Sequence, residues 1–442
     1  MKRLILTTIF LSLLCSSLAF ADVDGTVSLK ESVVDAVKQH PQIKALLYNR
    51  DAVSKSKAAS LGRFFPSLDL SSDYGLQNYN SSTTRAAETE QRNRTASDSS
   101  LTLTQNVFDG MDRYNDYQSE KARLNSADNR LIDNVETVAL DAIRAHIDVV
   151  RERKLTTLAG ENITAHQEVL NSIAERVAGG AGSKADEMQA RGRVARAETT
   201  LITYTGALRT AEAEYIRTVG KTPMVLADPE YHPEYIPGTM GQIMEKTLDN
   251  NPKIHIYKAE VEVTERDKNV VESSMYPDLD VELSSRYTNN LDGTETYLSD
   301  NRAMLALSWN LFSGGTDYND TRTAKARIME ARENLQDITD DLTRQVATAW
   351  AEYETSIGSI AKHQEALQYS IESRDMYLMQ FNVGQRSLLD VLDAINEVFS
   401  NSVLLETAQS NRNFTLFKFL TLEGDLIRTL EVAENTYDTL PQ

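Results

Sequence analysis

The sequence is poor in residues that carry chemistry. It contains one cysteine, Cys15, so no disulfide can form within the chain. Its six histidines are scattered, and neither an HExxH pattern nor a paired carboxylate indicates zinc. A GxSxG nucleophile motif is also missing. We therefore predict no catalytic residue, no cofactor and no metal site, and we expect that the protein is not an enzyme.

Long apolar runs and positive charge are scarce as well. Beyond the N-terminal segment no run of about 18 apolar residues occurs, so the sequence predicts no transmembrane helix. A membrane-spanning part would then have to be a β-barrel. The 46 basic and 65 acidic residues give a net charge of −19, which argues against nucleic acid as a partner.

The N-terminus has the pattern of a secretory signal peptide. Two basic residues follow the first methionine, residues 4–18 are apolar, and Ala19 and Ala21 are small residues at the positions that signal peptidase recognises. We predict that residues 1–21 form the signal peptide and that cleavage follows Ala21. Lipidation at Cys15 is the alternative, but Leu14 is too large for the lipoprotein cleavage motif.

The chain contains an internal duplication. His40-Pro41 recurs as Asn251-Pro252, and Asn106–Gly110 recurs as Asn310–Gly314. Each half predicts a helix, a strand pair, a long helix and a shorter helix. The spacing between matching residues shortens after the Ser/Thr/Asn-rich segment 67–100, which we expect to contain a longer loop in the first half. The predicted units are 22–220 (first repeat), 221–240 (equatorial linker, rich in proline), 241–426 (second repeat) and 427–442 (C-terminal equatorial or tail segment).

Alternating apolar residues predict four strands per chain. The apolar faces are Leu68, Leu70, Tyr74 and Leu76; Leu101, Leu103 and Val107; Leu279, Val281, Leu283 and Tyr287; and Leu305, Leu307, Trp309 and Leu311. The opposite faces are mostly polar, as the interior of a water-filled barrel requires. A half-buried sheet of a soluble protein would alternate in the same way, so the strands alone do not decide between the two.

The helices favour a tall assembly. Residues 111–176 and 316–380 lack proline and almost lack glycine, so each predicts one helix of about 65 residues, about 100 Å long. Their apolar residues recur at the 3-and-4 spacing of coiled coils. Four shorter helices are expected to stack in pairs to the same height: 186–220 on 241–275, and 29–62 on 385–426. Because four strands are too few for a hollow barrel, we infer three copies with twelve strands.

Three segments resemble the TolC family of outer-membrane channels, and the resemblance extends over the chain beyond the signal peptide. They are residues 101–109 and 305–314, where a strand passes into a helix, and residues 382–394, at a turn between two helices. The resemblance implies an α+β membrane protein. Its trimeric 12-stranded β-barrel, with four strands per chain, would continue into a long α-helical coiled-coil barrel that extends from the outer membrane into the periplasm.

The resemblance also implies an entrance at the periplasmic tip. Asp390 and Asp393 match an aspartate pair that lines the entrance, and in a trimer they would form an acidic ring that attracts cations. Arg386 matches a residue that ties the inner helix pair to its neighbour, and Asp186 occupies its partner position, so this pair is the expected latch. The alternative for the aspartates is an exposed acidic helix start that the helix dipole stabilises.

Two residues near the latch depart from the family pattern. Phe381 replaces a tyrosine and Ala185 replaces a threonine, so two hydroxyl-based links are missing. The tip itself is predicted from two matching turns between helices. They contain Gly180, Ser183, Gly384 and Ser387.

Together these features predict an outer-membrane export duct. The residues 382–394 and the absent lipid anchor favour type I protein secretion, with a periplasmic membrane-fusion adaptor and an inner-membrane ABC transporter as partners. A multidrug efflux duct served by an ABC transporter or a proton-driven pump is the alternative, and a periplasmic coiled-coil adaptor or scaffold is less favoured because it leaves the strands unexplained. The expected contacts are thus a homotrimer, outer-membrane lipid, the adaptor and transporter, and exported protein or small molecules.

Overall fold

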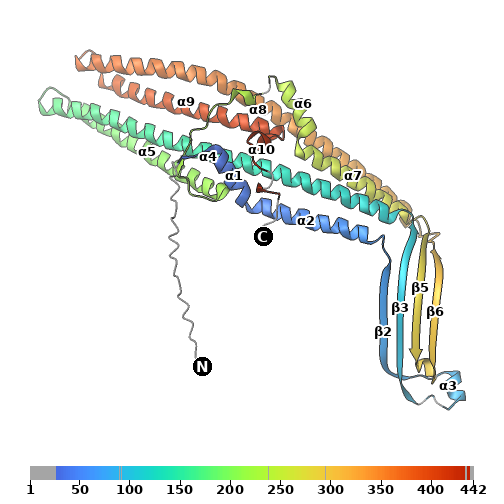
Figure 1. Ribbon diagram of the computed structural model, residues 1–442. Helices are drawn as coiled ribbons and strands as arrows, with labels where there is room; N and C mark the ends of the chain where they lie inside the picture. The colour runs from blue at the N-terminus through green and yellow to red at the C-terminus, as the bar shows by residue number, and fades with distance from the viewer. Residues whose placement is uncertain are drawn as a thin grey trace, which may run out of the picture.

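The computed structural model describes residues 26–88, 90, 92–236, 238–293, 295–433 and 436–438. The chain forms an elongated helical region with a four-stranded sheet at one end (Figure 1). The predicted signal peptide lies outside the described residues. Among the described helices, none combines the length and the apolar character of a membrane span.

The two halves repeat the same order of elements, as the duplication predicts. The first half contains β1 (Thr26–Val27), α1 (Leu29–Gln39), α2 (Pro41–Gly62), β2 (Ser67–Asn78), α3 (Ser82–Ala86), β3 (Asn93–Asp109), α4 (Asp112–Ala178) and α5 (Lys184–Val219). The linker contains β4 (Val225–Leu226) and η1 (Pro233–Tyr235). The second half contains α6 (Met240–Asn250), α7 (Pro252–Ser273), β5 (Asp278–Asn289), η2 (Leu291–Gly293), β6 (Tyr297–Ser308), α8 (Thr316–Asn382), α9 (Leu388–Leu422) and α10 (Leu426–Thr429).

The two long helices are present as predicted. α4 and α8 each have 67 residues, about 100 Å at 1.5 Å per residue. Where β3 passes into α4, Gly110 adopts a φ of +63°, and a Cβ atom there would lie 2.7 Å from the Ser273 carbonyl oxygen. Only glycine fits this close approach of two backbones without strain.

Two of the shorter helices are broken, which corrects the prediction that 29–62 and 241–275 are single helices. The breaks fall at His40 and Asn251, where the chain becomes extended with a ψ of 126° at each residue. Each of these residues precedes a proline, and the proline ring excludes the α conformation from the residue before it. The predicted helices are therefore the pairs α1–α2 and α6–α7.

The predicted stacking of the short helices is also wrong. α5 ends at Gly220 against Gln39 of α1, and a Cβ atom at Gly220 would lie 2.9 Å from the Gln39 side-chain oxygen. α9 ends beside the α6–α7 break, where Asn251 Nδ2 donates to the Leu422 carbonyl at 2.8 Å. Thus α5 continues the α1–α2 pair, and α9 continues the α6–α7 pair (Figure 1). Each stack of shorter helices therefore comes from one repeat.

The short helices stack within a repeat, and the linker does not lead α5 directly into α6. Instead, the linker turns back beside β1, with which β4 pairs in parallel through Thr26 and Val225. Arg153 of α4 fixes this course by donating to the carbonyl oxygens of Pro223 and Met224 at 2.9 and 2.6 Å. This small equatorial sheet has no counterpart in the prediction.

The larger sheet is antiparallel throughout, in the order β2-β3-β5-β6. Its register places the predicted apolar residues of all four strands on one face: Leu68 pairs with Leu103, which pairs with Leu283. A bulge between Asn106 and Phe108 interrupts the alternation near Val107. Trp309 and Leu311 lie beyond the end of β6, so their assignment to a strand was wrong.

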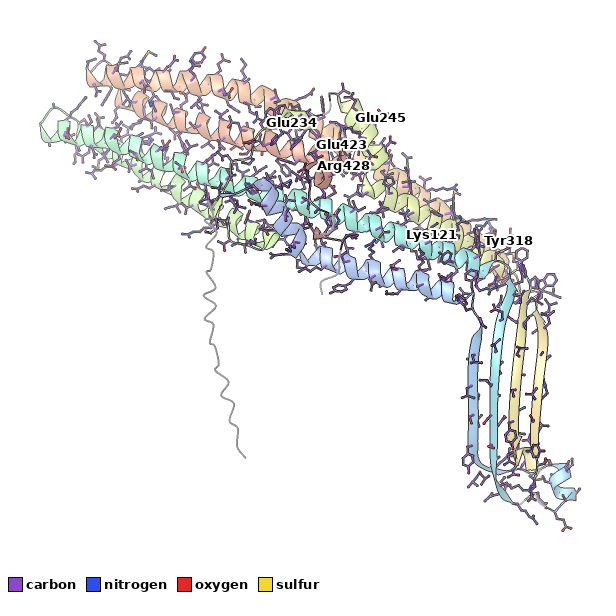
Figure 2. The ribbon with its side chains drawn as sticks, in the orientation of Figure 1. Lys121, Glu234, Glu245, Tyr318, Glu423 and Arg428 are labelled. Atoms are coloured by element: carbon purple, nitrogen blue, oxygen red, sulfur yellow. The ribbon has the colours of Figure 1, made fainter. Side chains whose placement is uncertain are left out.

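The loop difference between the halves follows the prediction. Residues 79–92 connect β2 to β3 and include α3, whereas the shorter segment 290–296 connects β5 to β6. Figure 2 shows side chains projecting from the strands and Tyr318 where the helices meet the sheet.

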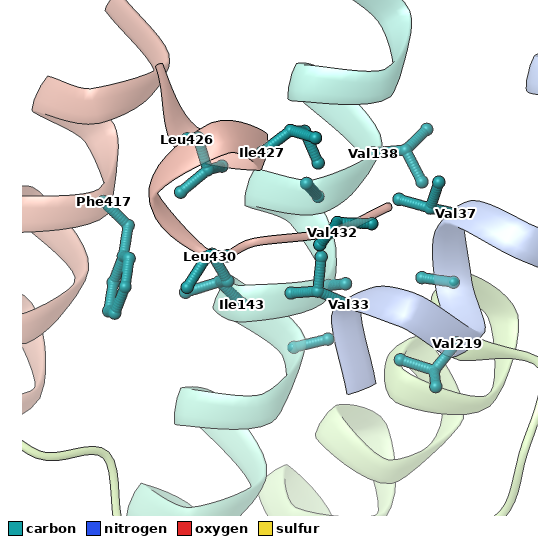
Figure 3. Close-up of a cluster of buried hydrophobic side chains, with 14 of the residues drawn as sticks. Val33, Val37, Val138, Ile143, Val219, Phe417, Leu426, Ile427, Leu430 and Val432 are labelled. Carbon is teal, nitrogen blue, oxygen red and sulfur yellow. The ribbon is translucent and has the colours of Figure 1, made fainter. Parts of the chain in front are cut away.

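Among the described residues, the largest apolar core lies at mid-height, where α1 packs near the C-terminal segment 426–432. Figure 3 shows Val33 and Val37 of α1 beside the C-terminal segment. The core side chains around them include Val138, Ile143, Val219, Phe417, Leu426, Ile427, Leu430 and Val432. Glu423 and Arg428 mark the same level in Figure 2.

A buried polar network joins this core to the linker. His146 Nε2 donates to the Ala227 carbonyl at 2.9 Å, and its Nδ1 lies 2.9 Å from the Ser32 hydroxyl. That hydroxyl lies 2.9 Å from the Tyr215 hydroxyl. Burial lowers the pKa of His146, so the ring is held neutral with its proton on Nε2.

Candidate entrance at the helical tip

The two turns at the far end of the helical region have the same geometry. Gly180 and Gly384 adopt left-handed backbone with φ of +76° and +77°. After each glycine the next backbone N–H donates to a carbonyl five residues back, from Ala181 to Arg176 and from Gln385 to Gln380. This hydrogen bond closes the preceding helix, and glycine is favoured there because it lacks a Cβ atom.

Serines begin the helices that follow these turns. The Ser183 hydroxyl accepts from the Ala185 N–H at 3.2 Å, and the Ser387 hydroxyl accepts from the Asp390 N–H at 3.3 Å. Such N-caps satisfy backbone donors that have no partner within the helix. The structure therefore places all four predicted turn residues at helix boundaries.

The tip is one packed unit of four helices. Phe381 of α8 and Leu392 of α9 are buried against residues of α4 and α5. The complete cluster is Val169, Leu170, Ile173, Ala190, Val194, Phe381, Leu388, Val391, Leu392 and Ile395. Because the cluster includes residues of both repeats, the two turns are held beside each other.

The predicted ring residues lie on one side of the start of α9. Arg386 Nε lies 3.1 Å from Asp390 Oδ2 in an ion pair that is not aligned as a hydrogen bond. The same guanidinium covers the Tyr377 ring at 3.9 Å from its centre. Asp393 is 56% exposed, and its Oδ1 accepts from Arg193 Nη2 of α5 at 2.5 Å.

Within the described part of a single chain, Arg386 pairs with Asp390 and does not form an ion pair with Asp186. Asp186 lies in the first turn of α5 and is half-buried. The predicted latch ties a helix pair to its neighbour, so it concerns contacts between copies and stays a prediction.

Sequence reasoning missed two arginines that connect the repeats at the tip. Arg193 follows Asp186 by two helical turns and therefore shares its face, which is a signal that could have indicated it. Arg176 of α4 covers the Phe381 ring at 4.7 Å and donates to Asn382 Oδ1 at 3.3 Å. Arg176 thus contacts the phenylalanine that replaces the family's tyrosine.

Among the described residues, no group of three or more His, Cys, Asp or Glu side chains is placed to hold a metal ion. Among the ion pairs at the tip, Arg193–Asp393 joins α5 to α9, whereas Arg386 and Asp390 are one helical turn apart.

Comparison with known proteins gives the family. A model described as outer membrane efflux protein matches residues 33–221 and 243–416. The outer membrane efflux protein BepC of Brucella suis biovar 1 (strain 1330) is 24% identical over 334 residues, which cover 75% of this chain and 73% of BepC. The outer membrane protein TolC of Salmonella enteritidis is 21% identical over 420 residues, which cover 92% of this chain and 83% of TolC.

The fold is shared with solved structures. A membrane protein from Pseudomonas aeruginosa superposes with a TM-score of 0.80 at 16% identity, covering 92% of each chain. BepC and TolC are both named as outer membrane proteins, and the solved structure of CusC, which shares the fold, is described in terms of transmembrane channel formation. Because the family model matches most of its length, the chain belongs to the outer membrane efflux protein family, the family of the TolC channels that its sequence resembles.

Proposed function

We propose that three copies of the chain form the exit duct of a tripartite export system. One observation carries the proposal: a sheet with an exposed apolar face and two free edges is joined directly to helices about 100 Å long. Soluble proteins rarely expose a large apolar face to water, whereas in a membrane such a face contacts lipid.

The free edges support assembly. Among the described strands, β2 and β6 each pair with one neighbour only. Unpaired edges cannot be left in a hydrocarbon layer, because each backbone N–H and C=O there needs a partner. Pairing β6 of one copy with β2 of the next would close a barrel of twelve strands in a trimer.

Exposure on the sheet supports contact with lipid. Tyr74 and Leu307 are 81% and 67% exposed in the single chain. Asp69, Glu282 and Arg286 occupy the opposite face, where they would line a water-filled lumen. The apolar face would then contact outer-membrane lipid.

At the other end, Asp390 and Asp393 of three copies would surround one axis as an acidic ring. Arg386 would lie at the edge of this ring, where it would reach Asp186 of the neighbouring copy and latch the entrance shut. Replacing Arg386 with Ser removes the guanidinium and its cover over Tyr377. We expect this variant to show higher single-channel conductance, and an unchanged conductance would contradict the latch.

For the finer function we propose type I protein secretion. The proposal rests on the segment 382–394, which resembles family members that serve type I protein secretion. The tip turns at Gly180 and Gly384 would dock a membrane-fusion adaptor, and an inner-membrane ABC transporter would supply the energy. Efflux of small molecules is the second candidate, because BepC is named an outer membrane efflux protein.

Two experiments test these proposals. Outer-membrane fractions should contain a trimer whose electrophoretic mobility changes on heating, whereas a periplasmic scaffold would remain in the soluble fraction. Deletion of the gene should then remove specific proteins from the culture medium and leave drug sensitivity unchanged. Increased drug sensitivity with a normal secreted profile would favour the efflux duct instead.

A further inference from the structure

Both carboxylates of the expected acidic ring have a guanidinium partner in their own chain. Asp390 pairs with Arg386 one helical turn away, and Asp393 pairs with Arg193 of another helix. The second pair differs from the first because it joins the two repeats. It therefore affects the position of α9 as well as its charge.

The Arg193 side chain is held in one direction. It is 21% exposed, and its Nη2 donates to Asp393 Oδ1 at 2.5 Å. His166 of α4 is 2% exposed, and its pKa is lowered by burial and by the Arg193 charge. Among the described residues, the ion-pair partner of the guanidinium is Asp393, so its positive charge acts on that carboxylate.

The tip is balanced in charge although the chain is acidic. Residues 174–193 and 374–393 contain six basic and six acidic side chains, whereas the whole chain has a net charge of −19. A ring of unpaired carboxylates would make the entrance strongly negative. The balance indicates that the arginines at the tip compensate this charge.

We propose that Arg193 is a positioning residue that fastens Asp393 to α5 and neutralises the Asp393 carboxylates of the three copies at the entrance. By doing so it sets the ion selectivity of the duct. The inference rests on the proposed function, because it requires Asp393 to line a passage. With Arg193 in place, Asp393 contributes little net charge to the passage. Without Arg193, three carboxylates would act on passing ions without compensation.

The test is the reversal potential of single channels in planar bilayers under a salt gradient. Purified trimers of the wild type, Arg193→Gln, Asp393→Asn and the double variant are compared. We expect Arg193→Gln to raise the permeability ratio of cations over anions on the order of twofold or more, and Asp393→Asn to lower it. The double variant removes both charges, so its ratio should return close to that of the wild type.

Arg193→Lys is the matched control. The lysine keeps the positive charge, so the ion selectivity of this variant should stay near the wild-type value. Its hydrogen bond to Asp393 should be weaker than that of the arginine. An exposed ion pair contributes little to folding, and heat-modifiable mobility confirms that each variant assembles.

The outcomes separate the inference from the proposed function. An unchanged reversal potential in Arg193→Gln would overturn the inference, as would a double variant that stays as altered as the single one. A wild-type trimer that forms no channel would overturn the proposed function instead.

Discussion

A buried glutamate predicts how the stability of the protein depends on pH. Glu136 of α4 is 4% exposed, and its two oxygens accept from the backbone N–H groups of Leu426 and Ile427, each at 3.2 Å. Burial raises the pKa of Glu136 from 4.5 to about 8, and the neighbouring Asp425 and Asp133 add to the rise. The carboxyl therefore fastens the C-terminal segment but is costly to ionise.

The direction of the pH dependence follows from the number of protons that the folded and unfolded states bind. The folded pKa lies above the unfolded value, so the folded state binds more protons between pH 4.5 and about 8. The stabilisation is fully present below pH 4.5 and is lost as the pH rises through about 8. A shift of this size corresponds to about 5 kcal/mol, at 1.36 kcal/mol per pKa unit.

Glu136→Gln removes the titration while retaining one acceptor oxygen. The second backbone N–H loses its partner at a cost of about 1–3 kcal/mol, so we expect a net gain of a few kcal/mol above pH 8 and a loss below pH 5. The melting temperature of the purified trimer, followed by circular dichroism from pH 5 to pH 9, measures both. Glu161→Gln, an exposed position on the same helix, is the control. Melting curves of Glu136→Gln that stay parallel to the wild type across this range would refute the reasoning.

Three further predictions concern stability. Leu392→Ala at the tip, where the side chain is fully buried, should cost about 2–5 kcal/mol, measured by denaturant unfolding, and the loss should be accompanied by faster proteolysis of the tip turns. Gly110→Ala should lower the melting temperature at a cost of about 1–3 kcal/mol, because its Cβ atom would collide with Ser273 at a positive φ. Burial lowers the pKa of His166 to about 4, so the folded state resists protonation and stability should fall by about 3 kcal/mol as the pH drops from 6.5 to 4. His166→Gln should flatten that fall in an acid titration of the melting temperature, and an equally steep fall in the variant would contradict it.

The elements that the sequence predicted correctly are those with long, regular patterns. α4 and α8 keep one spacing of apolar residues over 67 positions, and the strands alternate without a proline. The local spacing of apolar residues is sufficient to predict these elements, because each successive helical turn or strand residue pair buries a side chain on the same face.

The errors have local and distant causes. The breaks at His40 and Asn251 have a local signal, because each residue precedes a proline and the residue before a proline avoids the α conformation. The course of the linker could not be predicted, since it depends on Arg153 binding the carbonyl oxygens of Pro223 and Met224, which are 70 and 71 residues away in sequence. Such long-range contacts leave no periodic pattern in the chain.

At the candidate site, too, the sequence predicts the local turns but not the contacts between distant helices. The turn residues Gly180 and Gly384 followed from the repeat, because each turn imposes its own backbone geometry. The partner of Asp393 did not follow, because Arg193 meets it only after four helices have packed. Ion pairs between repeats depend on that packing and not on spacing along the chain.

The central claim is that three copies form a continuous passage, and recording from planar lipid bilayers tests it most directly. Trimers purified from the outer membrane should insert and produce discrete conductance steps of uniform size, one for each inserted trimer. Heat-dissociated chains from the same preparation should produce none. Folded trimers that insert into the bilayer but leave the current at its baseline would contradict the account.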